Sequence, residues 1–592
     1  MKAGAPDLTP YAFDVLLDRV AYEWRSRRRV FDLPTARFWS PHPETDLSMD
    51  FLGRPAATPV GPAAGPHSQM AQNIVLGWLA GARVFELKTV QVLDDLEIGR
   101  PCIDMETIGF NIEWSQELAV HESLEEYVKA WMAIEILSRW GPIRELVGPD
   151  PGPHVFDMSV GYDLDGIKTD KVASFIDSLM DASNEIERLR PIIPDSFAEF
   201  HDIDFPTCVS DTVTVSTFHG CPPDEIEAIA KHLMTRHGLD VIVKLNPTLL
   251  GFGDVAEILQ ETLGYEHIRL NRHVFPDDLH FERGVELIEE LREFARGEGR
   301  RFGIKLTNTL VVDNDKGWMP DDPMYLSGPP LHVLATTLLD ELLSAMPNVF
   351  KVAGHTGDVQ VTFSAGVTKE NLSTTVGMGV APATLSSDLL KPGGYGRLEP
   401  MLRKLTGDMR AAGVRNLADW HHYNWLEARA AGYRGPVEAH MRAILDGSEL
   451  DMYSYSGNQK TPRRVAHELQ MWGCVACNFC VTVCPNDAFF SISTPEGSGL
   501  DGRQQYMVLA ELCNDCGNCM TFCPEEGDPA QVKPKLFLTK RRFDMAEGKG
   551  FLLRAENGRV DVTSKPESQS ETERLVSVIN NEEGIPVGVN LR

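Results

Sequence analysis

Between residues 55 and 400, short runs rich in β-branched residues alternate with longer stretches whose apolar residues recur every three or four positions. The short runs predict strands, and the longer stretches predict amphipathic helices. The predicted strands are TPVGPAA, RVFELKTV, HVFDMSV, TVTVSTF, VIVKLN, HIRLN, FGIKLTN, VFKVAG and APATLSS. Strand–helix alternation over this length predicts a parallel α/β sheet, and eight repeats predict a (β/α)8 TIM barrel. Nine strands are one too many, and HIRLN is our choice for the strand outside the barrel.

Polar residues follow several of these strands directly. Lys88 follows VFEL, Lys244 lies in VKLNP, Asn308 and Thr309 lie in KLTNT, and STFHGCPP follows the fourth strand. The C-terminal ends of the strands carry the active site in TIM barrels. A single lysine there is usually solvated or paired. The whole set suits a flavin, which needs a cation near N1 and O2, amides for its carbonyls and backbone N–H groups for its phosphate. If the strand alignment is shifted, Lys305 takes the place of Lys244.

Two runs near the end of the chain share the spacing C-x2-C-x2-C-x3-C-P. This is the pattern of two-cluster ferredoxins, in which the fourth cysteine of each run ligates the other cluster. The pattern predicts two [4Fe–4S] clusters, one held by Cys474, Cys477, Cys480 and Cys523, and one held by Cys513, Cys516, Cys519 and Cys484. The alternative is a pair of zinc ribbons, whose C-x2-C pairs are usually separated by a dozen or more residues.

Composition and charge limit the kinds of partner that the protein can have. The formal net charge of −30 makes nucleic acid an unsuitable partner, because phosphate backbones would be repelled. No apolar stretch approaches the roughly 20 residues of a membrane span, and the N-terminal stretch lacks the features of an export signal. Eleven cysteines, eight of them in the two runs, indicate metal binding rather than disulfides. We therefore expect a cytoplasmic protein without a membrane partner.

The barrel region resembles the FMN domains of dihydroorotate dehydrogenase and dihydropyrimidine dehydrogenase. The segment ATPVGPAAGPHSQMAQNIVLGWLAGARVFELKTV is similar to their opening, FNIEW to their asparagine segment, and VKLNPT and KLTNT to strands under the flavin. YLSGPPL, VAGHTG and TLSSD are similar to segments around the cofactor and its phosphate. The resemblance implies FMN bound by the following residues: Lys88, Asn111, Lys244, Asn308, Thr309, Gly328, Gly354, Ser386 and Ser387. Dihydropyrimidine dehydrogenase also follows its barrel with a two-cluster module.

The same resemblance implies a proton donor on the loop after the fourth strand. HGCPP is similar to the Ser-Cys-Pro loop that carries the catalytic acid, which implies Cys221. His219 is a rival donor, since imidazole titrates near neutral pH. Lys88 completes the set of catalytic residues. The sequence leaves open which of Cys221 and His219 donates the proton.

A second resemblance covers nearly the whole chain. MSVGYDLDGIK, HGCPPDEIEAI, VKLNPTLLG, DLLKPGGY and CNDCGNC are similar to a bacterial family known as selenate reductase subunits, which is associated with purine breakdown. Long members of that family carry an FAD- and NAD(P)H-binding module, like the small subunit of glutamate synthase, between barrel and clusters. Here only about 75 residues, mostly helical in pattern, separate the two regions. GFGDVA at Gly251–Ala256 matches a dinucleotide fingerprint weakly, and we interpret it as a loop of the barrel.

We expect a helical N-terminal extension over 1–54, the FMN barrel over 55–400, a helical linker over 401–465, a ferredoxin-like α+β domain with two [4Fe–4S] clusters over 466–545, and a hairpin and tail over 546–592. Electrons would come from a separate NAD(P)H- and FAD-binding protein or from a ferredoxin. They would pass through the clusters and FMN to a heterocyclic, purine-like substrate. Two rivals remain: a dehydrogenase that delivers electrons to a ferredoxin, and a non-catalytic electron-transfer scaffold.

Overall fold

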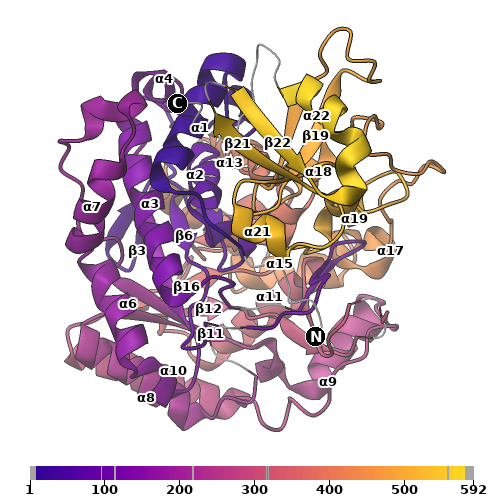
Figure 1. Cartoon of the computed structure of the whole chain (residues 1–592). Helices are drawn as coiled ribbons and strands as arrows, with labels where there is room; N and C mark the ends of the chain where they lie inside the picture. Colours follow the sequence, from indigo (N-terminus) through magenta and orange to yellow (C-terminus); the bar gives the residue numbers. More distant parts are fainter. Residues whose placement is uncertain are drawn as a thin grey trace.

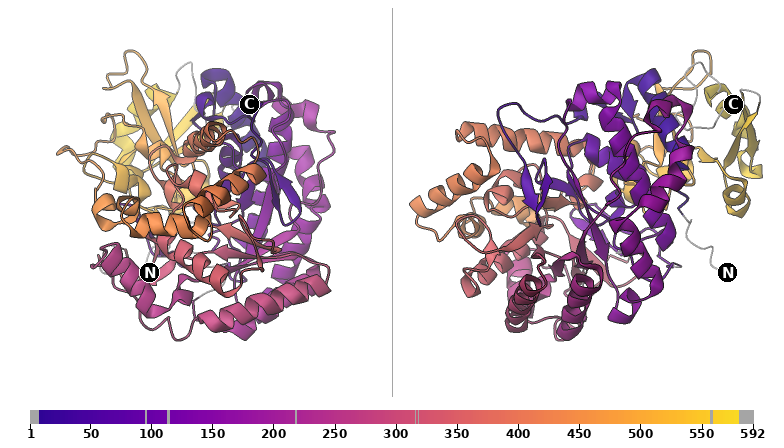
Figure 2. Two further views of the ribbon diagram at one scale, coloured as in Figure 1. Left: turned by 180° about the vertical axis from the view of Figure 1, so that it is seen from behind. Right: turned by 90° about the vertical axis from the view of Figure 1, so that its left-hand side faces the viewer.

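A computed structural model describes residues 8–94, 96–112, 115–216, 219–314, 316–317, 319–556 and 559–579. Eight parallel strands form its centre and follow one another in chain order (Figures 1 and 2). They are β5 (Val60–Pro62), β6 (Val84–Glu86), β9 (Val155–Val160), β10 (Thr212–Ser216), β11 (Asp240–Leu245), β12 (Phe302–Leu306), β16 (Val359–Phe363) and β17 (Ala383–Leu385). The first two strands meet where the Arg83 N–H donates to the Val60 carbonyl at 3.0 Å. The predicted TIM barrel is therefore confirmed.

Helices follow the barrel strands and surround them (Figure 1). The main ones are α2 (Ala71–Leu79), α3 (Val120–Arg139), α6 (Asp170–Met180), α8 (Pro223–His232), α10 (Phe281–Gly297), α11 (Pro329–Ala345), α12 (Leu372–Gly377) and α13 (Leu398–Ala411). Their starts obey local rules: the Thr169 side chain accepts from the Val172 N–H at the start of α6, and prolines occupy the first turns of α8 and α11.

Two of the nine predicted strands do not belong to the barrel. HIRLN, our choice for the extra strand, forms only an isolated bridge between Leu270 and Val312, so that choice is confirmed. VFKVAG was expected in the barrel, but it contributes only β15 (Phe350–Lys351), which pairs with one side of β16. The seventh barrel strand is VQVTF, which the sequence pattern missed. Its Gln360 is buried, and its amide donates to the Asp50 and Ala381 carbonyls at 2.9 Å each.

A four-stranded antiparallel sheet lies on the side where the barrel strands end. Its order is β13 (Leu310–Val312), β14 (Met324–Ser327), β8 (Gly109–Asn111) and β7 (Ile103–Asp104). Asn111 pairs with Tyr325 across β8 and β14, and with Ile103 across β8 and β7. The sequence analysis did not predict this sheet, since its strands are too short to show a period.

The region after the barrel begins with helices α14 (Leu417–Ala430), α15 (Pro436–Leu445), α16 (Leu450–Tyr453) and α17 (Tyr455–Asn458). A five-stranded sheet follows, with order β18 (Phe489–Ser493), β19 (Gln504–Leu509), β20 (Lys535–Phe537), β21 (Phe551–Glu556) and β22 (Arg559–Ser564). Helices α18 (Phe479–Thr482) and α19 (Asn518–Phe522) lie within the two cysteine runs. In Figure 1 the five-stranded sheet is orange to yellow and lies against one side of the barrel, whereas the right-hand view of Figure 2 shows the orange helices before it on the opposite side. The predicted C-terminal hairpin is β21–β22; its turn residues, Asn557 and Gly558, lie outside the described residues.

The remaining elements join or flank these parts. They are α1 (Phe13–Arg27), β1 (Arg29–Val30), β2 (Leu33–Pro34), β3 (Met49–Phe51), β4 (Arg54–Ala56), α4 (Gly141–Val147), α5 (Leu164–Ile167), α7 (Ser183–Leu189), α9 (Gly251–Ala256), α20 (Pro529–Val532), α21 (Lys540–Met545) and α22 (Thr572–Ile579). The weak dinucleotide match GFGDVA is α9, in the connection after β11. Within the described part of the chain, no helix is both long enough and apolar enough to cross a membrane.

Candidate functional site: a cavity at the barrel mouth beside the cysteine loops

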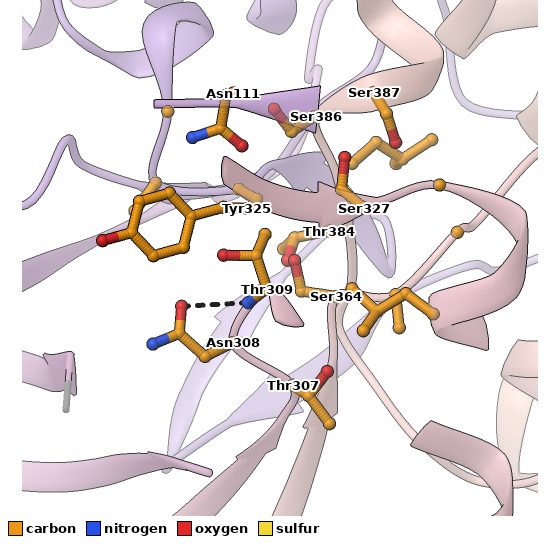
Figure 3. Close-up of a pocket in the computed structure, with 18 of the residues that line it drawn as sticks. Asn111, Thr307, Asn308, Thr309, Tyr325, Ser327, Ser364, Thr384, Ser386 and Ser387 are labelled. Atoms are coloured by element: carbon orange, nitrogen blue, oxygen red, sulfur yellow. Dashed lines mark hydrogen bonds between the residues drawn. The ribbon is translucent and has the colours of Figure 1, made fainter. Parts of the chain in front are cut away.

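A cavity opens where the barrel strands end. It encloses about 1330 Å³, including space open to solvent. The antiparallel sheet forms one of its walls (Figure 3). Nine of the predicted site residues line it: Lys88, Asn111, His219, Lys244, Asn308, Thr309, Gly328, Ser386 and Ser387. Figure 3 shows hydroxyl and amide side chains from both the barrel strands and the antiparallel sheet around the same space. The structure therefore brings together residues that are up to about 300 positions apart in the sequence.

Two lysines, Lys88 and Lys244, line the cavity. Among the described residues that line it there is no aspartate or glutamate. Removal from solvent, with a smaller contribution from the charge of Lys88, lowers the pKa of Lys244 to about 8. Lys305, the alternative to Lys244, is its neighbour on β12 but does not line the cavity; it is buried and forms an ion pair with Glu86. The geometry thus favours Lys244 as the cation for a bound anion.

Small residues line the end of the cavity that lies after the seventh and eighth barrel strands. Loops at this position form the phosphate site of many TIM barrels. Here they contribute Ser364 and Gly366 after β16, and Ser386 and Ser387 after β17. Gly366 has φ +53°, and a Cβ atom there would lie 2.4 Å from the Gly328 carbonyl oxygen, so only glycine fits. This end could hold a phosphate group on backbone N–H groups.

Gly354 does not belong to this site, contrary to the sequence-based expectation. It lies in the loop before β16, and a Cβ atom there would lie 2.0 Å from Cδ1 of Trp425 on α14. The error has one cause: VFKVAG was taken as the strand whose end carries the phosphate loop. Gly366 occupies the position that Gly354 was expected to fill, and recognition of VQVTF as a strand would have identified it.

The two candidate proton donors lie in different places. His219 lines the cavity; its Nδ1 is 2.8 Å from Asp278 Oδ2, and its Nε2 is 3.0 Å from the Thr309 carbonyl oxygen. Cys221 is buried and does not line the cavity. Burial, and then the charges of Glu225 and Asp278, raise the pKa of the Cys221 thiol to about 12. His219 is therefore better placed to meet a ligand in the cavity.

The cysteine runs pack together in a crossed arrangement. One cavity of about 320 Å³ is lined by Cys474, Cys477 and Cys480 of the first run and by Cys523 of the second. The charge of Cys484 in turn acts on Cys513, Cys516 and Cys519, and contributes to raising the pKa of each. All eight thiols are free.

The donor set fits iron–sulfur clusters. All eight candidate ligands in the two runs are cysteines, and each [4Fe–4S] cluster is held by four thiolates.

The second cysteine run contacts the barrel cavity through two segments. The Cys102 and Ile103 N–H groups both donate to the Cys516 carbonyl oxygen at 3.1 Å, and Ile103 also lines the cavity. The Asn518 amide donates to the Leu390 carbonyl oxygen at 2.9 Å, and Leu390 lines the cavity as well. A single layer of residues therefore separates the second cysteine loop from the cavity.

Comparisons with known proteins agree with this architecture. A barrel with a cavity at its strand ends, joined to a cysteine module of ferredoxin type, is typical of iron–sulfur oxidoreductases. Residues 31–430 match the family described as oxidoreductase YgfK, N-terminal TIM-barrel domain, and residues 473–526 match the 4Fe-4S dicluster domain. The chain therefore belongs to the YgfK oxidoreductase family and carries a 4Fe–4S domain.

Individual relatives extend the comparison. YgfK of Escherichia coli strain K12, named as a candidate oxidoreductase, is 40% identical over 526 residues, as is YgfK of Escherichia coli O157:H7. The match covers 85% of this chain and 47% of each relative, so the chain spans about half their length. A ferredoxin of Rickettsia felis is 29% identical over 80 residues, which are 13% of this chain and 64% of that protein.

Among solved structures, a ligand-free DHODH from Eimeria tenella matches with 14% identity and a TM-score of 0.39, over 68% of this chain and 97% of the other. The complex of DHODH from Eimeria tenella with ferulenol gives the same two values, over 71% of this chain and 96% of the other. These values are too low to indicate a shared cofactor or substrate.

Proposed function

We propose that this chain is an FMN- and iron–sulfur-dependent oxidoreductase subunit. Two [4Fe–4S] clusters would pass electrons to FMN in the barrel cavity, and a heterocyclic, purine-like substrate would be reduced there. The observation that carries the proposal is the double role of Ile103, which lines the cavity and donates its N–H to Cys516. An electron-transfer module packed against a cavity in this way can deliver electrons into it.

The cavity residues suit FMN in charge and shape. Lys244 would lie beside N1 and O2 and stabilise negative charge on the reduced ring, and Lys88 would lie near it. Amide groups of Asn111 and Asn308 and the hydroxyl of Thr309 can bind ring carbonyls and ring N–H groups. The small residues around Gly366 and Ser387 would hold the phosphate. When bound, FMN would supply the hydride, and the residues of the chain would orient the substrate and provide the proton.

The cluster held mainly by the second run would be the one next to the cavity. The three second-run cysteines, Cys513, Cys516 and Cys519, are buried, whereas Cys477 of the first run is exposed. Val475 and Phe479 beside it are 53% and 36% exposed. An electron donor would therefore reach the first-run cluster, and electrons would continue to the second. A separate NAD(P)H- and FAD-binding protein, or a ferredoxin, would be that donor.

A substrate screen tests this function. The anaerobic protein is reduced with dithionite, freed of the excess, and mixed with individual purines and pyrimidines while the flavin absorbance is followed. Reoxidation by one class of heterocycle, and none by dihydro compounds of the same class, is the expected result. A protein that contains iron but no flavin would contradict the proposal and favour an electron-transfer scaffold.

A further inference from the structure

Asp278, which the sequence analysis did not single out, forms the centre of a buried hydrogen-bond network beside the cavity. Its side chain is 1% exposed. Its carboxylate accepts from His219 Nδ1 at 2.8 Å, from Thr248 Oγ1 at 2.6 Å and from Asn246 Nδ2 at 3.4 Å, and also from the Gly220 N–H. The loops after β10 and β11 are thus both tied to one carboxylate from the segment before α10.

Both ring nitrogens of His219 face hydrogen-bond acceptors. A carboxylate and a backbone carbonyl can only accept hydrogen bonds. Because Asp278 faces Nδ1 and the Thr309 carbonyl faces Nε2, both bonds can form only when both ring nitrogens carry a proton. Tyr325 stacks on the ring with a centroid separation of 6.4 Å and an interplanar angle of 24°. The geometry thus presents an acceptor to each ring nitrogen of His219, with Nε2 in the cavity wall.

Asp278 is suited to stabilise the positive charge of a doubly protonated His219. Burial raises the pKa of the carboxyl group, but hydrogen bonds and charge from His219, with Thr248 and Gly220, outweigh burial and leave the pKa below its ordinary value. The carboxylate thus stays ionised near neutral pH. Charged or titratable groups near this region, among the described residues, include Tyr325 on the ring, Asp277, Cys221 and Glu225, and Lys88 and Lys244 in the cavity wall.

We propose that Asp278 is a positioning residue that keeps His219 protonated and oriented as the proton donor to a substrate in the cavity. This proposal rests on the proposed function. When bound, reduced FMN would supply the hydride to one atom of a substrate double bond. The Nε2–H of His219 would exchange its hydrogen bond to the Thr309 carbonyl oxygen for one to the substrate, and its proton would then form a new bond to the neighbouring substrate atom as the Nε2–H bond breaks. His219 is left neutral with Nδ1–H still bound to Asp278, and a proton from solvent restores it.

The test uses diethyl pyrocarbonate, which acylates neutral imidazole and not imidazolium. The rate of modification of His219 is measured as a function of pH by peptide mass spectrometry on the full-length protein as purified, whether or not it contains flavin. In Asp278→Asn, the pH at which His219 reacts at half its maximal rate should fall by about one unit or more, the effect of removing an opposite charge at this range. Asp278→Glu should bring this pH back toward the wild-type value.

Asp277→Asn is the matched control, because it removes the same charge from the exposed neighbouring residue. It should leave the His219 profile unchanged. If Asp278→Asn does not fold, Asp278→Ser takes its place. An unchanged pH profile of His219 in the folded neutral variant would overturn the proposal. The readout needs neither flavin turnover nor substrate, so a shifted profile in a protein that lacks flavin would contradict the proposed function alone.

Discussion

At the scale of a single residue, the protonation state of Lys244 should control how tightly the cavity binds an anion. Because its pKa is lowered to about 8, it loses its proton above this pH while the site is empty. A bound FMN is anionic and favours the ammonium form, so binding above pH 8 must take up a proton. We therefore expect the affinity for FMN to fall by up to about tenfold per pH unit above pH 8.

Fluorescence quenching of FMN on the flavin-free protein, between about pH 7 and 10, measures this dependence. Lys244→Ala should weaken binding and flatten the curve, or make the flavin potential more negative. If Lys305→Ala has these effects and Lys244→Ala does not, the assignment of the flavin lysine is wrong.

The two candidate proton donors, His219 and Cys221, can be distinguished by their effects on the proton step. A positioned acid typically contributes about 10²–10⁴-fold to the rate. Because His219 lines the cavity and Cys221 does not, His219→Ala should slow flavin reoxidation by substrate by about that factor, and Cys221→Ala should slow it far less. Stopped-flow measurements separate flavin reduction, which should be normal in both variants, from reoxidation. Collapse of reoxidation in Cys221→Ala alone would restore the cysteine as the acid.

At the scale of residues, the sequence could identify those cavity residues that lie directly after strands. Lys88, Lys244 and Asn308 could be found because a strand end is a local feature of the chain. Asp278 could not, since it lies in a loop without periodicity and meets His219 across 59 positions. Gly354 was chosen in place of Gly366 because the strand before it was misassigned.

At the scale of elements, the fourth cysteine of each run lies beside the first three cysteines of the other run. Cys523 lines the cavity of the first run, and Cys484 acts on the thiols of the second. Cys484→Ser should therefore damage the cluster held mainly by the second run. Iron content and EPR spectra of the anaerobically purified variant decide this, with Cys523→Ser as the matched control that should affect the other cluster. Loss confined to the first-run cluster in Cys484→Ser would refute the crossed assignment.

The barrel itself could be predicted because strand and helix alternate with different periods. The seventh strand was missed because Gln360 and Thr362 interrupt its apolar run, and only tertiary hydrogen bonds make their burial possible. The sheet of β7, β8, β13 and β14 was missed for a related reason. Strands of two to four residues are stabilised by pairing across the chain, and no local pattern marks them.

At the scale of the whole molecule, the arrangement predicts how electrons enter. The first-run loop is exposed around Cys477, and the second-run loop packs on the barrel cavity. The isolated chain should therefore accept electrons from dithionite and oxidise NADH and NADPH negligibly, because the proposed route begins at a separate protein. Anaerobic absorbance spectra measure both reactions. Rapid bleaching of the flavin by NADPH alone, without a second protein, would contradict this prediction.

The central claim is that one chain holds FMN in the barrel cavity beside two [4Fe–4S] clusters. The most direct measurement is the flavin, iron and sulfide content of the anaerobically purified protein. We predict about one FMN and about eight irons with eight sulfides per chain, as two four-iron clusters require. A full complement of iron with no flavin, or flavin with no iron, would contradict it.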